Sequence, residues 1–187
     1  MKYLVAALFS LLLLSGCSST QPIYLHLSPD LTVSDAQYPN TPSVALTSAD
    51  LRTNKHIVSI TEKSKPTQLI NNDAPINDVL ADKLGQALTQ QGVSITSLAT
   101  TKVHLEVIQL VTEVTQYRTK HTAKNTVELR LVVTTPARKV TKQYKNITSS
   151  EGSFSPSSAD LEAALDKLLA NVLNQMLVDK QVQQEIK

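Results

Sequence analysis

The chain has 187 residues, with 18 Lys and Arg against 16 Asp and Glu, a formal net charge of +2 and a single cysteine. This near balance of charges argues against a nucleic-acid-binding protein, which normally has a strongly basic surface. One thiol cannot build a disulfide framework, and the low aromatic content (5 Tyr, 2 Phe, no Trp) disfavours a sugar-binding shelf. The length suits one domain with its own hydrophobic core.

The N-terminus predicts an export signal. Lys2 precedes an apolar run at residues 3–14, which is too short to cross a hydrocarbon layer because a spanning helix needs about 20 residues. A basic start and a short apolar run are typical of a secretory signal peptide, here residues 1–16. The alternatives are a signal peptide with an unrelated cysteine or a buried N-terminal helix.

Residues 14–17, Leu-Ser-Gly-Cys, resemble a bacterial lipobox. The resemblance implies cleavage before Cys17, a diacylglycerol thioether on its sulfur and an acylated N-terminus. Acyl chains contribute about 0.8 kcal/mol per buried CH₂, so three chains would hold a domain durably on a bilayer. In lipoproteins of this class Asp after the cysteine favours the inner membrane, so Ser18 implies sorting to the outer membrane.

Residues 17–42 are expected to form the lipidated cysteine and a flexible tether, because this stretch is rich in Pro, Ser, Thr and Asp. A short extended piece is expected at residues 23–27. Residues 43–187 are expected to form a single periplasmic domain.

The first half of this domain predicts short strands followed by a helix. Alternation of apolar and polar residues predicts strands at 44–47, 57–61 and 67–70, with a turn at 48–53. Apolar residues spaced three and four apart predict a helix over about 74–91. Asp73 is expected to cap its N-terminus and Gly92 to supply a left-handed C-terminal cap.

The second half predicts longer strands and a final helix. Strands are expected at 93–95, 102–115, 127–134 and 140–149, with a polar loop at 116–124. The apolar phase of the second of these strands changes along its length, which indicates a bulge or twist. A leucine stripe predicts a helix beginning at Ser157 or Ser158, and residues 182–187 are expected to add a helical turn.

This order of elements predicts an α+β fold: a two-layer sandwich in which two amphipathic helices pack on one face of a mainly antiparallel sheet. The alternation in strand 127–134 supports one buried and one solvated face.

Two groups of charged residues are candidates for a recognition site. Asp50 and Arg52 are expected to form a structural ion pair or a polar recognition point at the sheet end. Lys139, Lys142 and Lys145 lie on a strand that we expect at the sheet edge. A partner could bind there by edge pairing or by charge.

No catalytic or metal motif is evident. His26, His56, His104 and His121 have no metal-ligand spacing. There is no G-x-S-x-G motif and no phosphate-binding loop. The sequence therefore indicates no catalytic residue, no metal and no cofactor.

Several blocks along the chain match one family. They are the lipobox at 14–17, Ser28-Pro29, Ala-Asp-Leu-Arg-Thr at 49–53, the helix ending in Gly92, Glu-Gly-Ser-Phe at 151–154 and Ile-Lys at 186–187. Through these blocks the whole chain resembles the YajG family of envelope lipoproteins. The resemblance implies an outer-membrane lipoprotein that faces the periplasm, and it implies no established enzyme activity.

We therefore expect a non-catalytic binding or assembly module, anchored through Cys17, whose partner is an envelope protein or a cell-wall component. One alternative is a hydrolase or lyase acting on cell-wall material, which would need a site with shifted pKa values. The other is a homo-oligomeric structural lipoprotein.

Overall fold

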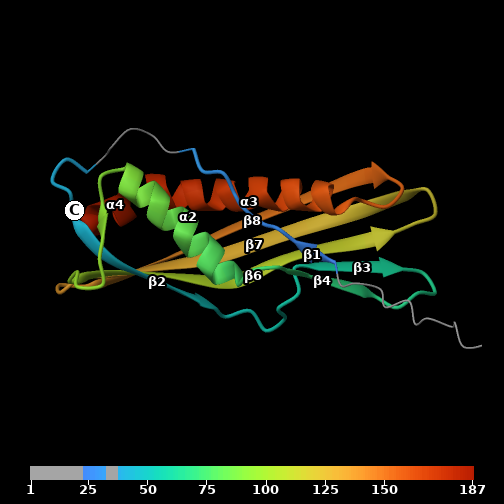
Figure 1. Ribbon diagram of the computed structural model, residues 1–187, viewed down its shortest axis with the longest axis horizontal. Coiled ribbons are helices and arrows are strands. Elements are labelled where there is room, and N and C mark those ends of the chain that lie inside the picture. Colours follow the sequence, from blue (N-terminus) through green and yellow to red (C-terminus); the bar gives the residue numbers. More distant parts are fainter. Residues whose placement is uncertain (1–22, 33–37) are drawn as a thin grey trace, which may run out of the picture.

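The sheet is organised around its longest strand. The computed structural model describes residues 23–32 and 38–187. Strand β6 (Thr101–Gln116) continues through tight turns into β7 (Lys120–Thr134) and β8 (Lys139–Ser153), and these three strands form an antiparallel meander (Figure 1). Among the strands that the structure describes, β8 pairs only with β7, and it forms one edge of the sheet.

The other edge of β6 is shared by two short strands. β2 (Ser43–Asp50) pairs in parallel with the first half of β6, and β3 (Val58–Glu62) pairs in parallel with its second half. β5 (Ser94–Ile95) extends the sheet beyond β2 in parallel. Beyond β3 lie β4 (Gln68–Asn72), which is antiparallel to β3, and then β1 (Tyr24–Leu25), which is parallel to β4.

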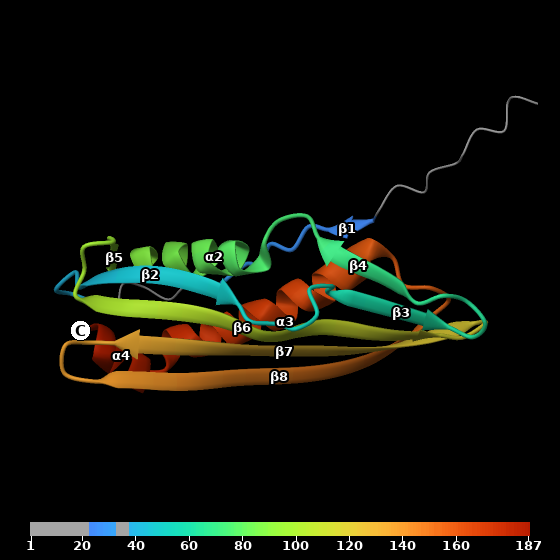
Figure 2. The same cartoon turned by 90° about the horizontal axis from the view of Figure 1, so that it is seen from below.

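Helices α2 (Ile76–Gln90) and α3 (Ser158–Val178) cover one face of this sheet, and the sheet curls beside them (Figures 1 and 2). Their apolar stripes are buried against the strands, as the residue spacing predicts. Ser157 and Asp160 form a capping box at the start of α3. The short helix α4 (Lys180–Ile186) follows, so the expected final turn is confirmed.

The fold is mixed α/β, and the expected mainly antiparallel sheet requires correction. The pairings of β2 and β3 with β6, of β1 with β4 and of β2 with β5 are all parallel. The reason is that α2 carries the chain back along the sheet between the early strands and β6. A connection of this kind allows the next strand to run parallel to the earlier ones.

Part of the expected tether belongs to the domain. Leu25 and Leu27 are buried, and the backbone N–H of Leu27 donates to Asn72 Oδ1 at 3.0 Å. The backbone N–H of His26 donates to Glu162 of α3 at 2.9 Å. The stretch from 23 to 32 therefore packs on the domain, whereas the expected signal peptide, the lipobox-like residues 14–17 and Cys17 lie outside the described residues.

Three further expectations can be compared with the structure. The ladder between β6 and β7 shifts register between Val107 and Gln109, which confirms the bulge. Residues 116–124 are no loop, because β7 already begins at Lys120. The N-cap of α2 is Pro75 rather than Asp73, and it makes no side-chain capping bond.

Gly92 ends α2 with φ of 91°, and a Cβ there would lie 2.9 Å from the carbonyl oxygen of Tyr38. We expect Gly92→Ala to lower the free energy of unfolding by about 1–3 kcal/mol, since the backbone strain and the close contact add. Urea denaturation followed by circular dichroism measures this.

Gly85→Ala is the matched control. Its Cβ would meet only Leu46 Cδ2, at 3.2 Å, and this side chain can move. Alanine also gains about 1 kcal/mol of helix propensity there. Equal free energies of unfolding for Gly92→Ala and Gly85→Ala would show that Gly92 is not needed for its backbone conformation or its close contact with Tyr38.

Candidate functional site

The face of the sheet away from the helices, which we call the outer face, is polar. Residues of β6 and β7 alternate between the core and this face. Rungs of paired outer-face residues cross the strands at Glu106 and Arg130, at Glu113 and Lys124, and at Thr115 and Thr122. Thr126 and Glu128 also point outward, yet they are only 5% and 8% exposed. These two side chains are therefore covered by their neighbours on the outer face.

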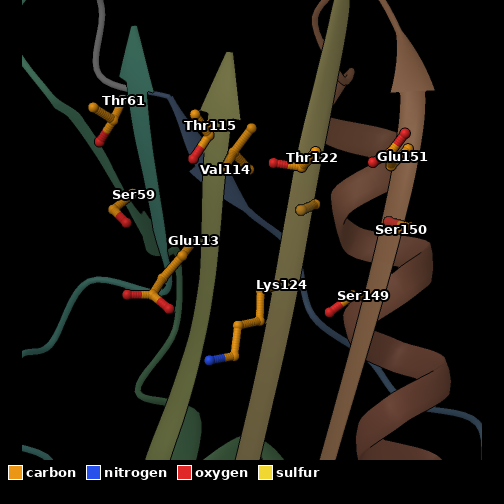
Figure 3. A pocket seen from close by; sticks show the side chains of 11 residues that line it. Ser59, Thr61, Glu113, Val114, Thr115, Thr122, Lys124, Ser149, Ser150 and Glu151 are labelled. Carbon is orange, nitrogen blue, oxygen red and sulfur yellow. The ribbon is translucent and has the colours of Figure 1, made fainter. Parts of the chain in front are cut away.

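Two adjoining hollows lie on the outer face. The larger, of about 640 Å³, crosses β3, β6, β7 and β8 and is shown in Figure 3, where α3 lies behind the strands. The smaller, of about 430 Å³, lies over the bulge of β6 and the segment between β2 and β3. Ser59 and Glu113 line both, so the two hollows form one continuous surface.

Opposite charges meet in the larger hollow without pairing. Glu113 and Lys124 are register partners on β6 and β7, and both project from the outer face in Figure 3. Both are exposed. Within residues 23–32 and 38–187, neither side chain has an ion-pair partner within 4.0 Å. The hydroxyl groups that surround them belong to Ser59, Thr61, Thr115, Thr122, Ser149 and Ser150.

The neighbouring charges on this face are already paired. Lys145 Nζ lies 2.8 Å from Glu128 Oε2, and Arg130 pairs with Glu106. The hydrogen bond and charge of Lys145, helped by a hydrogen bond from Gln143, outweigh burial and hold the pKa of Glu128 below its usual value. Glu128 is therefore ionised at neutral pH and serves the structure of the face.

Asp50 and Arg52 form the structural ion pair. Arg52 Nε and Nη2 each lie 2.9 Å from a carboxylate oxygen of Asp50, and Nη1 donates to the carbonyl of Leu110 at 3.3 Å. The Arg52 side chain is only 6% exposed. Burial alone would raise the pKa of Asp50, but Arg52 and Lys55 outweigh this and hold it below its usual value. Arg52 lines the smaller hollow as part of its floor.

The three lysines of β8 do not share one surface. Because side chains alternate along a strand, Lys142 points to the helix side and Lys145 to the outer face. Lys142 Nζ lies 3.1 Å from Asp179 Oδ2, at the N-terminus of α4. Lys139 is exposed near the turn between β7 and β8. The structure therefore does not bring the three lysines together, although β8 is an edge strand as expected.

The histidines are dispersed. His56 lines the smaller hollow, and His104 Nδ1 lies 2.8 Å from Thr47 Oγ1. His121 Nδ1 lies 2.7 Å from the carbonyl oxygen of Phe154, and His26 Nδ1 lies 2.6 Å from Asp73. In the part of the chain that the structure describes, no three His, Cys, Asp or Glu residues are arranged to hold a metal ion.

The sequence reasoning missed Glu113 and Lys124. Glu113 lies after the bulge, where the apolar phase of β6 has changed, and Lys124 lies in the segment expected to be a loop. Ala123 and Val127 continue the alternate core positions of Leu129, Leu131 and Val133, and this phase was the signal that could have placed Lys124 on a strand.

Comparison with known proteins identifies the family. A family model described as "Uncharacterized lipoprotein" matches residues 29–187. The chain belongs to this lipoprotein family. It is 23% identical over 189 residues to the uncharacterized lipoprotein YajG of Escherichia coli K12, covering 100% of this chain and 97% of that protein. YajG of Escherichia coli O6:H1 gives the same values. The resemblance drawn from the sequence blocks is confirmed.

A solved structure shares the fold of this family member. Protein XCC0632 from Xanthomonas campestris superposes with a TM-score of 0.53 at 15% identity, covering 88% of this chain and 99% of that one. This likeness concerns the fold alone. Within the described residues, none of the helices has both the length and the apolar character needed to cross a bilayer.

Replacing Arg52 by Met should lower the free energy of unfolding by about 2–3 kcal/mol at pH 7. The substitution leaves Asp50 and the carbonyl of Leu110 without their donor in a largely buried place. Lys55 Nζ, 3.3 Å from Asp50, offsets part of the loss. Chemical denaturation measures the change. Lys65→Met is the control, because the Lys65–Glu62 pair is exposed and such pairs contribute about 0–1 kcal/mol.

The stability of Arg52→Met should also depend on pH differently from that of the wild type. The lowered pKa of Asp50 stabilises the native state above the unfolded value of 3.8, and this contribution is lost as the pH falls through the folded value. Arg52→Met should therefore lose less stability than the wild type below pH 3.8. Parallel pH profiles would show that Arg52 does not hold the Asp50 pKa down.

Proposed function

We propose that this lipoprotein is anchored to the outer membrane through acylated Cys17, faces the periplasm and acts as a non-catalytic binding module. The lipobox at residues 14–17 supports the anchor, and membership of a lipoprotein family supports a place in the envelope. The anchor confines the domain to a thin layer, which raises its effective concentration for partners in the same layer.

The observation that carries the binding role is the unpaired Glu113 and Lys124 on the floor of the larger hollow. An exposed acid and base in register, with no ion pair of their own among the described residues, present both signs of charge to an incoming group. The surrounding hydroxyl groups can each donate and accept a hydrogen bond. A polar peptide segment that carries both signs of charge can pair with Glu113 and Lys124, and its backbone amides can bond to the surrounding hydroxyl groups.

A protein partner suits this surface better than a glycan. Among the described residues that line the two hollows there is no Phe, Tyr or Trp ring on which a sugar could stack. Ile147 lies beside the larger hollow on β8 and is 49% exposed. A polar patch with an apolar residue beside it has the composition of a non-obligate protein interface.

The absence of catalysis is part of the proposal. General acid–base catalysis needs a group whose pKa is tuned near the working pH. Of the acidic residues in the two hollows, Glu128 has a pKa lowered by Lys145 and is committed to that ion pair. This arrangement supports binding rather than proton transfer.

Replacing Cys17 by Ala, in a chain that keeps a cleavable signal, should move the protein from the membrane fraction to the soluble periplasmic fraction. Fractionation of envelopes and mass spectrometry of the N-terminal peptide measure this. Wild-type protein should carry acyl chains and sediment with the outer membrane, and Ser18→Asp should shift it toward the inner membrane. An unmodified Cys17 in the wild type would refute the anchor.

A photo-crosslinking residue at Ser149, on the rim of the larger hollow, should capture a defined envelope protein in living cells. Glu113→Lys should reduce this adduct by roughly tenfold or more, because like charges brought together at an interface cost several kcal/mol and about 1.4 kcal/mol already lowers affinity tenfold. Adducts are quantified by mass spectrometry after pull-down of the full-length protein.

Two controls use the opposite side of the domain. Asp82 and Gln86 are exposed on α2, so Asp82→Lys should leave the Ser149 adduct unchanged and a crosslinker at Gln86 should not capture the same partner. If Asp82→Lys weakened the adduct as much as Glu113→Lys, the outer face would not be the binding surface.

A further inference from the structure

We infer that one end of the domain rests on the membrane surface, and this inference depends on the lipid anchor of the proposed function. The end in question, which we call the turn end, consists of residues 62–67, which include the turn from β3 to β4, residues 117–120, which include the turn from β6 to β7, and Phe154 after β8. Its partner is the headgroup layer of a phospholipid bilayer that contains anionic lipid.

Backbone pairing brings these three segments together. Glu62 is the register partner of Gln116, so the two turns leave the sheet side by side. The N–H of Phe154 donates to the carbonyl of Thr119 at 2.9 Å, and the N–H of Tyr117 donates to the carbonyl of Lys120 at 2.8 Å. The turn end lies at the opposite end of the long axis from the C-terminus (Figure 1).

The chain enters the domain from the side of the turn end. β1 is parallel to β4, with Tyr24 opposite Asn71, and β4 runs away from the turn that joins it to β3. Six residue steps separate Cys17 from Ile23, which span at most about 20 Å. β6 alone has 16 residues and is roughly 50 Å long. The anchor therefore reaches the turn end much more readily than the opposite end.

The exposed side chains of the turn end suit a bilayer interface. Tyr117 is 50% exposed and Phe154 is 69% exposed. Leu69 on β4 is also exposed, and so are Ile23 and Tyr24 where the chain enters the domain. Aromatic residues with exposed aliphatic neighbours favour the level of the lipid headgroups.

The charges of the turn end favour anionic lipid. Within the turn end four cations, Lys63, Lys65, Arg118 and Lys120, outnumber one carboxylate, Glu62. The carboxylates of Glu151 and Asp160 lie beside it. Lys65 pairs with Glu62 at 2.9 Å, and Lys120 lies 3.7 Å from Glu151 and 5.9 Å from the Tyr117 ring centre. Lys63 and Arg118 have no ion pair among the described residues, so both can contact lipid phosphate groups.

The backbone of Phe154 gives independent support. Its φ is 58°, a left-handed conformation that is costly for an aromatic residue. Two hydrogen bonds hold it there, from its N–H to Thr119 and between its carbonyl and His121. The surrounding strands thus keep a large apolar ring in a strained conformation in which it is exposed, and a lipid contact gives this ring a function.

Site-directed labelling of the complete lipidated protein tests the inference. Acylation occupies the thiol of Cys17, so one introduced cysteine can carry a fluorophore, placed by Thr119→Cys or Thr67→Cys at the turn end and by Leu98→Cys or Pro136→Cys at the other. The protein is reconstituted into phosphatidylethanolamine–phosphatidylglycerol vesicles that contain headgroup-nitroxide lipid. The turn-end labels should be quenched and the labels at the opposite end should not. Equal quenching, or stronger quenching at Leu98, would overturn the inference.

A double variant tests the side chains themselves. Tyr117→Ser with Phe154→Gly removes both rings, and glycine suits the left-handed backbone, so the fold should survive. Quenching at Thr67→Cys should then be lost, whereas Leu98→Ser should not change it. Retained quenching in the double variant would refute a contact through these rings.

The outcomes separate this inference from the proposed function. Absence of acyl chains on Cys17 would overturn both the anchor and the membrane contact. Loss of the Ser149 adduct in cells, with turn-end quenching intact, would refute only the binding role of the outer face. Equal quenching at the two ends, with the adduct retained, would refute only the membrane contact.

Discussion

The Asp50–Arg52 ion pair closes the break between β2 and β3 along the edge of β6. β6 is too long for either β2 or β3 alone, so its edge passes from one to the other beside the bulge at Val107. The chain must leave the ladder there and return, which exposes backbone groups. Arg52 fills this gap by holding Asp50 and the Leu110 carbonyl, and the N–H of Leu51 donates to the carbonyl of Val107 at 2.9 Å. The smaller hollow lies here because the side chain of Arg52, rather than a paired strand, covers this part of β6.

The two faces of the sheet are stabilised in different ways. The helix side is packed with aliphatic residues, and Thr112 and Asn125 form a buried hydrogen bond of 2.7 Å between β6 and β7. The outer face depends on charge pairs across strands, such as Glu106 with Arg130. Against this background Glu113 and Lys124 differ, since they occupy the same kind of rung but stay apart. Other opposite charges on this face are paired, and the unpaired Glu113 and Lys124 therefore support the proposal that a ligand binds there.

Local patterns in the sequence predicted the elements well and their arrangement less well. Alternation and helical spacing located nearly every strand and both long helices, because burial of one face imposes these periods. The direction of β2 and β3 relative to β6 depends on the long-range connection through α2, and local periodicity in the sequence does not predict this direction. The burial of Leu25 and Leu27 was missed because proline and polar residues surround them in the sequence, while the residues against which they pack are distant in the chain.

The ion pair of Asp50 and Arg52 was found because its partners are two residues apart. Glu113 and Lys124 meet only through the register of two strands.

The position of the larger hollow links the two proposals. Thr61, Thr115, Thr122 and Glu151, which line it, form the rung immediately before the turn end. A domain that rests on the bilayer through its turns therefore holds this hollow beside the membrane surface. A partner that binds Glu113 and Lys124 must then reach this level, which favours another membrane-attached protein or the juxtamembrane segment of one over a freely diffusing protein. Restricting both partners to the same thin layer raises their effective concentration, so a small polar contact surface can suffice for occupancy.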